Sequence, residues 1–234
     1  VDEVYDFREG LAVFKIGGKY GFIDKTGETI IKPEFDWAWN FSEGLAGVKI
    51  GDKWGYINKA GEIVIKPQFD EVNDFSEGLA RVKINDDGQY GFIDRTGKTI
   101  IDYKFDFADD FSEGLAGVNI DGEYGFINQI GKIVIKSEFE HVGHFSEGLA
   151  SASVYDENGL ESYGFINKTG KMVIKPQFNY TNDFKEDLAK VNVGGENGYI
   201  DKNGKMVIKP QFPWAFDFNE GLARVNVGDR KSVV

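Results

Sequence analysis

The chain has 234 residues and a formal net charge of −12, because 39 Asp and Glu outnumber 27 Lys and Arg. It has no Cys, which excludes disulfides and Cys-based metal sites, and it lacks the Lys- and Arg-rich run that would favour a nucleic-acid partner. No apolar stretch approaches the roughly 18 residues of a membrane-spanning helix, so we expect no membrane insertion.

One short stretch recurs seven times along the chain and organises it. Its fullest form is Phe-Ser-Glu-Gly-Leu-Ala, and its copies begin at Phe7, Phe41, Phe75, Phe111, Phe145, Phe184 and Phe218. The glycine falls at positions 10, 44, 78, 114, 148 and 221, and Asp187 replaces it in the sixth copy. A fixed period of this length is typical of tandem-repeat proteins. We predict a single array over residues 1–234, with repeats at about 10–43, 44–77, 78–113, 114–147, 148–186 and 187–220 and a partial repeat at 221–234.

Each repeat is predicted to contain three short strands, described here for the second repeat. Residues 46–50 alternate between apolar and small or polar side chains, as in a half-buried strand. The next strands are 54–58 and the apolar run 62–66, which ends at Pro67 because proline cannot donate to a strand ladder. Between them, Asn58-Lys59-Ala60-Gly61 predicts a type I turn with a glycine bulge. The three strands form an antiparallel meander.

The segment that joins one meander to the next is predicted to be a short 3₁₀ turn or irregular. In residues 68–75, apolar side chains fall at steps of three, at Phe69, Val72 and Phe75. The repeats differ in length only at Asn85–Gln89 and Tyr155–Ser162, which we predict to be exposed loop tips.

The fold class that follows is all-β, with three-stranded units stacked face to face. The second and third strands of each repeat carry apolar side chains on both faces, so each unit must cover its neighbours. We favour an open solenoid or superhelix, with a closed β-propeller as the alternative, because a propeller blade usually has four strands in about 40–45 residues.

The segment Lys53-Trp54-Gly55-Tyr56-Ile57, preceded by Phe41–Ala46 and followed by Gly61, resembles the WG repeat, also called the KWG repeat. This is a bacterial tandem β-repeat family, and the resemblance covers residues 5–228. Only Trp54 supplies the literal Trp-Gly pair; the other copies have Tyr, and the sixth has Asn197. The resemblance implies a non-catalytic interaction or surface module, often part of a larger protein, with no catalytic residues to carry over.

Three polar sets are candidate chemical sites, and for each we favour a structural role. The repeated glutamates could bind Ca²⁺ or act on a sugar, but a residue present in every repeat normally serves the repeat, through backbone hydrogen bonds or an ion pair with a lysine such as Lys66. His141 and His144 are interpreted as substitutions on a solvated loop, and Asn85-Asp86-Asp87-Gly88 as a longer hairpin tip. The glutamates are Glu9, Glu43, Glu77, Glu113, Glu147, Glu186 and Glu220.

Aromatic side chains in the joining segments are the candidate binding residues. Trp37 and Trp39 lie two apart, so one projects outward if that segment is extended, and Trp214 lies in the equivalent segment of a later repeat. Exposed aromatic rings bind sugars and anchor protein interfaces. The Trp54 ring is assigned to the core.

The favoured function is a non-catalytic scaffold that binds a protein partner as a module of a larger bacterial protein. The alternative is a carbohydrate- or cell-wall-binding array that uses the loop aromatics Trp37, Trp39 and Trp214. Further rivals are a hydrolase using Glu77 and Glu113 and a spacer without a ligand. No cofactor, metal or catalytic residue is expected. A cell-envelope or extracellular location is considered, although the acidic start at residues 1–4 differs from a signal peptide.

Overall fold

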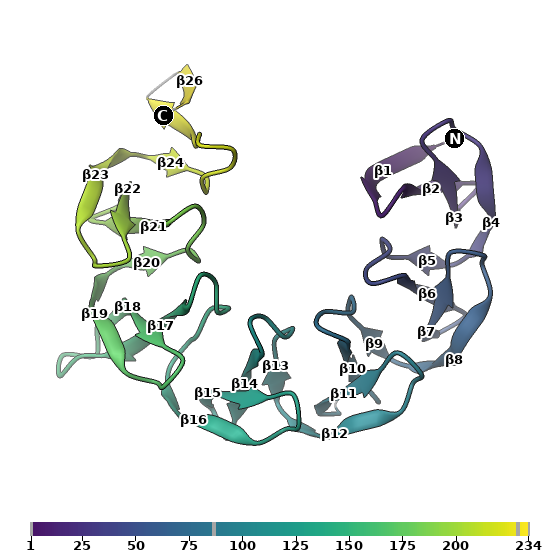
Figure 1. The fold of residues 1–234 in the computed structure, drawn as a ribbon, viewed down its shortest axis with the longest axis horizontal. Helices are drawn as coiled ribbons and strands as arrows, with labels where there is room; N and C mark the ends of the chain where they lie inside the picture. The colour runs from purple at the N-terminus through teal and green to yellow at the C-terminus, as the bar shows by residue number, and fades with distance from the viewer. Residues whose placement is uncertain (1, 86–87, 228–229, 234) are drawn as a thin grey trace. The chain divides into compact units, whose positions relative to one another are not determined.

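The structure is a computed structural model that describes residues 2–85, 88–227 and 230–233 (Figure 1). The chain forms two compact units. Unit 1 comprises residues 1–111 together with Gln129–Gly131, and unit 2 comprises Ser112–Asn128 and Lys132–Val234. The described residues of both units form β-strands, turns and bends, without a helix.

Unit 1 contains three four-stranded antiparallel sheets, in the orders β1-β2-β3-β4, β5-β6-β7-β8 and β9-β10-β11-β12. Their strands are β1 (Glu3–Arg8), β2 (Leu11–Ile16), β3 (Lys19–Asp24), β4 (Thr29–Phe35), β5 (Trp37–Ala38), β6 (Leu45–Ile50), β7 (Lys53–Asn58), β8 (Ile63–Phe69), β9 (Glu71–Val72), β10 (Leu79–Lys83), β11 (Tyr90–Asp94) and β12 (Thr99–Phe105), followed by β13 (Phe107–Ala108). The long strands β4, β8 and β12 lie along one side of the unit, and the short β5 and β9 lie toward the other (Figure 1).

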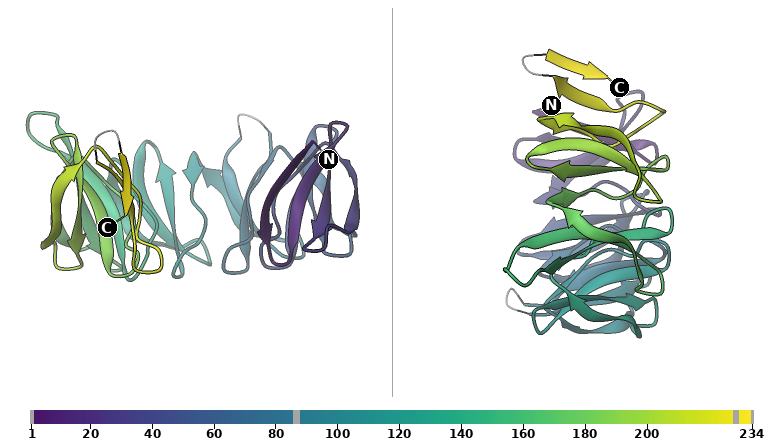
Figure 2. Two further views of the ribbon diagram at one scale, coloured as in Figure 1. Left: turned by 90° about the horizontal axis from the view of Figure 1, so that it is seen from above. Right: turned by 90° about the vertical axis from the view of Figure 1, so that its left-hand side faces the viewer.

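Unit 2 is also antiparallel, with a four-stranded sheet β20-β21-β22-β23 and the three-stranded sheets β17-β18-β19 and β24-β25-β26. Its strands are β14 (Leu115–Ile120), β15 (Glu123–Asn128), β16 (Ile133–Phe139), β17 (Leu149–Tyr155), β18 (Glu161–Asn167), β19 (Met172–Phe178), β20 (Tyr180–Thr181), β21 (Leu188–Val193), β22 (Glu196–Asp201), β23 (Met206–Phe212), β24 (Trp214–Ala215), β25 (Arg224–Val227) and β26 (Arg230–Val233). Consecutive strands pair antiparallel within each sheet, and the turns that join them lie at the two ends of the sheets (Figure 2).

The predicted three-stranded meander is confirmed, and in most repeats the structure adds a fourth, very short strand, which beside β17 is reduced to a single bridge between Val142 and Ala152. Residues 71–72, predicted to be a 3₁₀ turn or irregular, form β9, in which Val72 pairs with Val82 and Glu71 with Lys83. The apolar steps of three are also explained, because Phe69, Val72 and Phe75 are all buried. The sequence pattern missed this strand because two residues are too few to show a period of two.

The predicted end of the third strand at Pro67 is wrong. Strand β8 continues to Phe69, and between the pairs Tyr56–Ile65 and Trp54–Phe69 a single residue of β7, Gly55, faces three residues of β8. Pro67 lies in this bulge, where no ladder donor is required. A Cβ at Gly55 would lie 2.4 Å from the Ile65 carbonyl oxygen, so the glycine between the two aromatics is required by close backbone approach.

The predicted type I turn with a glycine bulge is confirmed. The Asn58 side-chain oxygen accepts the N–H groups of Ala60 and Glu62, both at 3.0 Å, and the N–H of Gly61 donates to the Asn58 carbonyl at 2.9 Å. Gly61 has φ of 82°, as the bulge position requires. The loop tip around Asp156 is likewise exposed, as predicted, and residues 86 and 87 of the other predicted tip lie outside the described residues.

The repeated Glu-Gly pair makes a second hairpin turn that the sequence analysis described only as a bend. Ser42 and Leu45 exchange backbone hydrogen bonds of 2.9 and 3.1 Å across Glu43 and Gly44. These two residues have φ of 50° and 80°. Positive φ at both central positions is the signature of a type I′ turn. The glutamate therefore occupies a left-handed conformation that glycine or asparagine normally takes.

Hydrophobic clusters are shared between neighbouring repeats, which confirms face-to-face stacking. One cluster joins Leu45, Tyr56 and Ile65 of the second repeat to Ala80, Val82 and Ile93 of the third. Phe69, Val72 and Phe75 of the joining segment complete the cluster. The prediction that the third strand is buried on both faces is wrong, because β8 is an edge strand on which Ile63 and Val64 are 51% and 42% exposed. Only alternate residues such as Ile65 enter the core.

Candidate binding surfaces

Trp37 and Trp39 belong to a run of aromatic rings on unit 1, which we name the unit-1 aromatic cluster. Neighbouring rings of the run lie 4.9–6.5 Å apart, and the last two are stacked with an interplanar angle of 4°. Trp37 and Trp39 are 40% and 42% exposed, whereas Ala38 between them is buried. Both tryptophans therefore project outward from the same side of an extended segment, whereas the sequence predicted this for only one of them. The cluster comprises Tyr5, Tyr20, Trp37, Trp39 and Trp54.

Glycine at position 47 makes room for the Trp39 indole. The backbone N–H of Trp39 donates to the Gly47 carbonyl at 2.9 Å. A Cβ at Gly47 would lie 3.0 Å from Trp39 Cδ1. In the next repeat, Arg81 replaces this glycine, and its guanidinium lies over the Tyr90 ring at 5.1 Å from the centroid. The residue at this position therefore decides whether an aromatic face is left open or covered by a cation.

Beside Trp39 lies a pocket of about 250 Å³ with two carboxylates in its lining. Its wall includes Trp39, Asn40, Asp74 and Asp110. Asp74 is exposed at the surface, but partial burial of its carboxylate raises its pKa, and the charge of Asp110 raises it further. Arg8 lowers the pKa by a smaller amount. The Oδ1 atoms of Asn40 and Asp110 are buried and have no hydrogen-bond partner among the described residues. The pocket therefore offers acceptor oxygens next to an aromatic ring.

Trp214 has a different setting, in unit 2. It is 71% exposed and lies on β24, where it pairs with Asn226. Trp214, Phe216 and Arg224 together line a pocket of about 180 Å³. The Arg224 guanidinium lies 4.0 Å from the centre of the Phe216 ring. This surface is aromatic but already holds its own cation.

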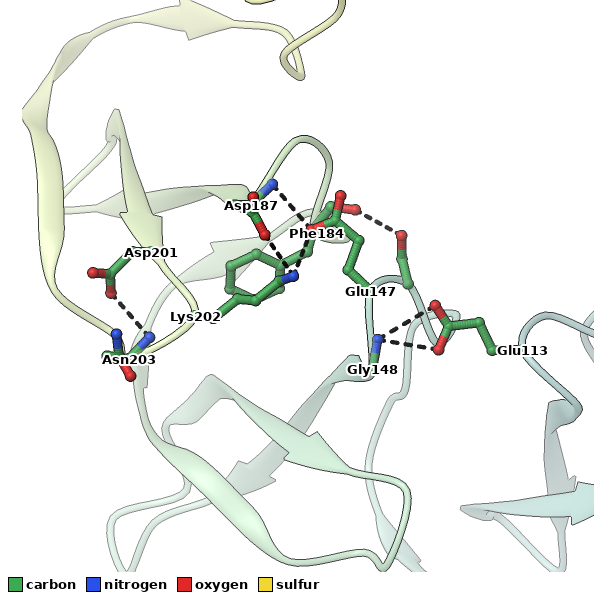
Figure 3. Close-up of polar contacts among 9 residues, drawn as sticks. Glu113, Glu147, Gly148, Phe184, Asp187, Asp201, Lys202 and Asn203 are labelled. Carbon is green, nitrogen blue, oxygen red and sulfur yellow. Dashed lines mark hydrogen bonds and ion pairs between the residues drawn. The ribbon is translucent and has the colours of Figure 1, made fainter.

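The repeated glutamates connect neighbouring repeats. Glu113 Oε2 accepts the N–H of Gly148 at 3.1 Å and pairs with Lys168 at 3.0 Å. Glu147 contacts the N–H of Asp187 and Lys202 in the same way, both at 3.0 Å (Figure 3). Glu9, Glu43 and Glu186 accept the equivalent N–H at 2.8–3.0 Å. The predicted structural role is confirmed, except that the paired lysine lies in the turn before the third strand and not after that strand.

The pairing of Glu113 predicts a pH-dependent stability contribution. Burial alone would raise its pKa, but the hydrogen bonds from Lys168 and Gly148 outweigh burial and hold the pKa below its ordinary value of 4.5. Such a group stabilises the fold above its unfolded pKa and loses that contribution as the pH falls through the folded pKa. We expect Glu113→Gln to lower the free energy of unfolding by about 1 kcal/mol at pH 7.

Urea unfolding at pH 7 and near pH 3 checks this expectation. The difference between the wild type and Glu113→Gln is expected to shrink at the acidic pH, as Glu113 takes up a proton and loses its charge. A difference that is the same at both pH values would contradict a contribution from the charge of Glu113. A double-mutant cycle with Lys168→Gln separates the ion pair from the backbone hydrogen bond.

The WG-containing repeat matches this chain seven times, over residues 1–20, 20–54, 54–86, 90–124, 124–156, 163–196 and 198–230. The chain belongs to the WG-containing repeat family. The Gly55 geometry gives a physical reason for the glycine of the WG pair, because no side chain fits between it and the bulge of the next strand. The recurring contacts of Glu113 and its counterparts likewise belong to the architecture of the WG repeats.

Solved structures with a similar backbone have very different sequences. Hsv2 of Kluyveromyces lactis aligns with a TM-score of 0.53 and 9% identity over 97% of this chain and 94% of that chain. KlHsv2 with loop 6CD replaced by a Gly-Ser linker gives 0.52 and 7%, over 93% and 85%. The WD40 domain of Toxoplasma gondii coronin gives 0.45 and 11%, over 86% and 67%. No curated protein matches the chain. At these identities the likeness concerns the fold alone.

Among the described residues of the WG repeats, no cluster of three or more His, Asp or Glu side chains could hold a metal ion. The described chain also has no helix that is long and apolar enough to cross a membrane. His141 and His144 are half-exposed and pair with Glu161 at 2.8 Å and Asp183 at 3.6 Å.

Sequence reasoning missed the pocket beside Trp39. Asp74 and Asp110 occupy the same position in consecutive WG repeats, and nothing in the sequence distinguishes them from ordinary loop residues. The sequence held only a weak signal, since Gly47 lacks the long cation of Arg81, Lys190 and Arg224, but Gly117 lacks it as well.

Proposed function

We propose that this chain is a non-catalytic WG-repeat scaffold that binds a partner protein through the unit-1 aromatic cluster. The observation that carries the proposal is the exposed Trp39 ring beside the Asp74 and Asp110 carboxylates. A lysine or arginine side chain fits this pair of features, because a cation is attracted both by an aromatic face and by carboxylates. Exposed tryptophans are also the commonest anchors of protein interfaces.

The charge of the chain supports a basic partner. The formal net charge is −12, and Asp36 and Asp52 line a further pocket against Trp37. Acidic surfaces accelerate association with cationic partners and do so less as salt is added. The raised pKa of Asp74 indicates a carboxylate whose ionised form would gain from a cation supplied by a partner.

The experiment is a comparative capture of proteins by wild type, Asp74→Asn/Asp110→Asn and Asp102→Asn. Asp102 is exposed on β12, so its variant controls for the loss of a carboxylate outside the pocket, at half the charge change of the double variant. We expect a protein retained by the wild type and by Asp102→Asn to bind the double variant at least about tenfold more weakly, and to be released by moderate salt. The double variant is expected to be at least as stable as the wild type, because it removes neighbouring like charges.

Two results would contradict the proposal. Equal retention by all three baits would place binding elsewhere on the chain. Retention of glycan instead of protein, with loss on replacing Trp39, would favour the alternative of a carbohydrate-binding array. A Trp214→Phe variant adds a direct readout, since its remaining tryptophans all lie in the unit-1 aromatic cluster and their fluorescence reports on that surface.

A further inference from the structure

A polar pocket of about 380 Å³ lies within unit 2, and it differs in character from the pocket beside Trp39. It is formed by residues 141–144, by the short strand β20 and by side chains of β17 and β18. Its volume falls in the range of about 300–1,000 Å³ that is usual for small-molecule sites. Aromatic rings, carboxylates, an amide and hydroxyl groups all line it.

The pocket depends on an unusually small residue at position 143, and a small residue at position 151 also leaves it open. A Cβ at Gly143 would lie 2.4 Å from Ser151 Oγ and 2.8 Å from Asp183 Oδ1, so no side chain could be added there without displacing the lining. The corresponding positions elsewhere carry a larger side chain, namely Trp39, Asn73, Asp109, Asn182 and Phe216. Ser151, like Gly47 and Gly117 at the equivalent position, is shorter than Arg81 and Lys190, which lie over aromatic rings; the ring beneath Lys190 is Tyr180, whose centre lies 5.8 Å from Nζ.

Thr181 is a polar side chain that the fold does not need. It is 4% exposed, lines the pocket, and its hydroxyl has no hydrogen-bond partner among the described residues. The equivalent residues of the other repeats are all apolar: Val4, Ala38, Val72, Ala108, Val142 and Ala215. Asn182 Oδ1 is also buried without a partner in the described chain. A buried unpaired polar group destabilises a protein, so a partner supplied by a ligand is a natural explanation.

The chemistry of the lining selects a neutral ligand. The charged groups are already paired with each other: His144 lies 3.6 Å from Asp183, and Lys185 lies 4.0 Å from Asp217. An ionic ligand would therefore compete with existing partners. Tyr163 and Tyr180 lie with their ring centres 5.9 Å apart, and Tyr180 is 52% exposed. Aromatic faces combined with hydroxyl, amide and carboxylate acceptors match the apolar faces and hydroxyl groups of a sugar.

We infer that this pocket binds one residue of a neutral saccharide, with Tyr180 against a face of the sugar ring and Thr181 and Asn182 hydrogen-bonded to its hydroxyl groups. The inference is independent of the proposed protein-binding surface, because every residue that carries it lies in unit 2. It also differs from the glycan-binding alternative, which involves Trp37, Trp39 and Trp214.

Ligand-observed NMR with the full chain tests the inference. The probes are the methyl glycosides of glucose, galactose, mannose and N-acetylglucosamine, each at about 10 mM so that millimolar affinities are seen. Lysine methyl ester and inorganic phosphate are the charged controls. We expect saturation transfer to at least one glycoside and none to the charged probes. No transfer to any glycoside, or transfer to a charged probe that Thr181→Val abolishes, would overturn the inference.

The matched variants are Thr181→Val and Thr99→Val. Valine is found at the equivalent position in three other copies, at Val4, Val72 and Val142, so Thr181→Val is expected to fold with unchanged or higher stability while its glycoside affinity falls about tenfold. Thr99 is exposed on β12 in unit 1, and its variant is expected to bind like the wild type. Undiminished binding by a stable Thr181→Val would overturn the assignment of this pocket.

Discussion

Phe75→Ala is expected to lower the free energy of unfolding by about 3–5 kcal/mol, the range observed when a buried phenylalanine is truncated. Phe75, which leads into β10 of the sheet β9–β12, is 1% exposed, and its ring meets that of Tyr56 in β7 of the preceding sheet at 4.9 Å in an edge-on arrangement. The variant removes both the buried area and this ring pair. Because the cluster around Phe75 is shared by two repeats, little of the cavity can be filled by local collapse. Urea unfolding followed by circular dichroism measures the change.

Phe7→Ala is the matched control for this prediction. Phe7 occupies the same position of the repeated stretch, but its side chain is 42% exposed and so loses much less buried area. We expect a loss of about 1 kcal/mol or less. Equal losses for the two variants would show that the phenylalanine stabilises its own turn, and would contradict the conclusion that it acts through the neighbouring repeat.

The same ring pair recurs through both units, and it indicates how stability is distributed. From the second copy on, the ring centre of each phenylalanine of the repeated stretch lies 4.8–4.9 Å from that of an aromatic residue in the preceding Tyr/Trp/Asn-Gly-aromatic strand, such as Phe22 for Phe41. Each of these contacts contributes to the interface energy between adjacent repeats only. A weakened repeat is therefore expected to destabilise the adjoining repeats first. The Ser42 hydroxyl, which donates to the Phe75 carbonyl at 2.8 Å, adds a polar contact to the same junction.

Much of the fold follows from the sequence, because short turns and strand alternation are local properties. The Asn58–Gly61 turn was predicted residue by residue, since an Asn or Asp followed by a glycine three positions on determines its hydrogen bonds. The bulge opposite Gly55 could not be predicted, because it depends on how two strands pair. For the same reason the positive φ of Glu43 was missed: nothing in the residue type indicates that a contact with the next repeat fixes it.

The candidate surfaces were predicted less completely than the fold. The exposure of Trp214 and of one of the pair Trp37 and Trp39 could be anticipated from their place in the joining segments, but not the exposure of both members of the pair. The ring stacking of Trp39 on Trp54 and the pocket containing Asp74 could not, because they join residues from different elements. Thr181 was visible only as a departure from an otherwise apolar position. Departures of this kind are informative in repeats, because whatever the architecture requires is already present in the other copies.

Gly55→Ala is expected to be the most disruptive single-methyl change in the second repeat. The new Cβ would lie 2.4 Å from the Ile65 carbonyl oxygen and 2.7 Å from the Pro67 nitrogen, and both are backbone atoms that cannot move aside as a flexible side chain can. Either the bulge of β8 or its pairing with β7 must shift. We expect a loss of about 3 kcal/mol or more, at the upper end of overpacking effects.

Gly51→Ala separates this steric effect from the general cost of replacing a glycine. Gly51 has φ of 62°, and a Cβ there would have no atom within 4 Å, so only backbone strain of about 1 kcal/mol is expected. Urea unfolding of the two variants compares them directly, and amide hydrogen exchange in Gly55→Ala is expected to show lost protection first at the pairs between β7 and β8. A Gly55→Ala variant no less stable than Gly51→Ala would mean that the glycine of the WG pair is retained for a reason other than the approach of the two strands.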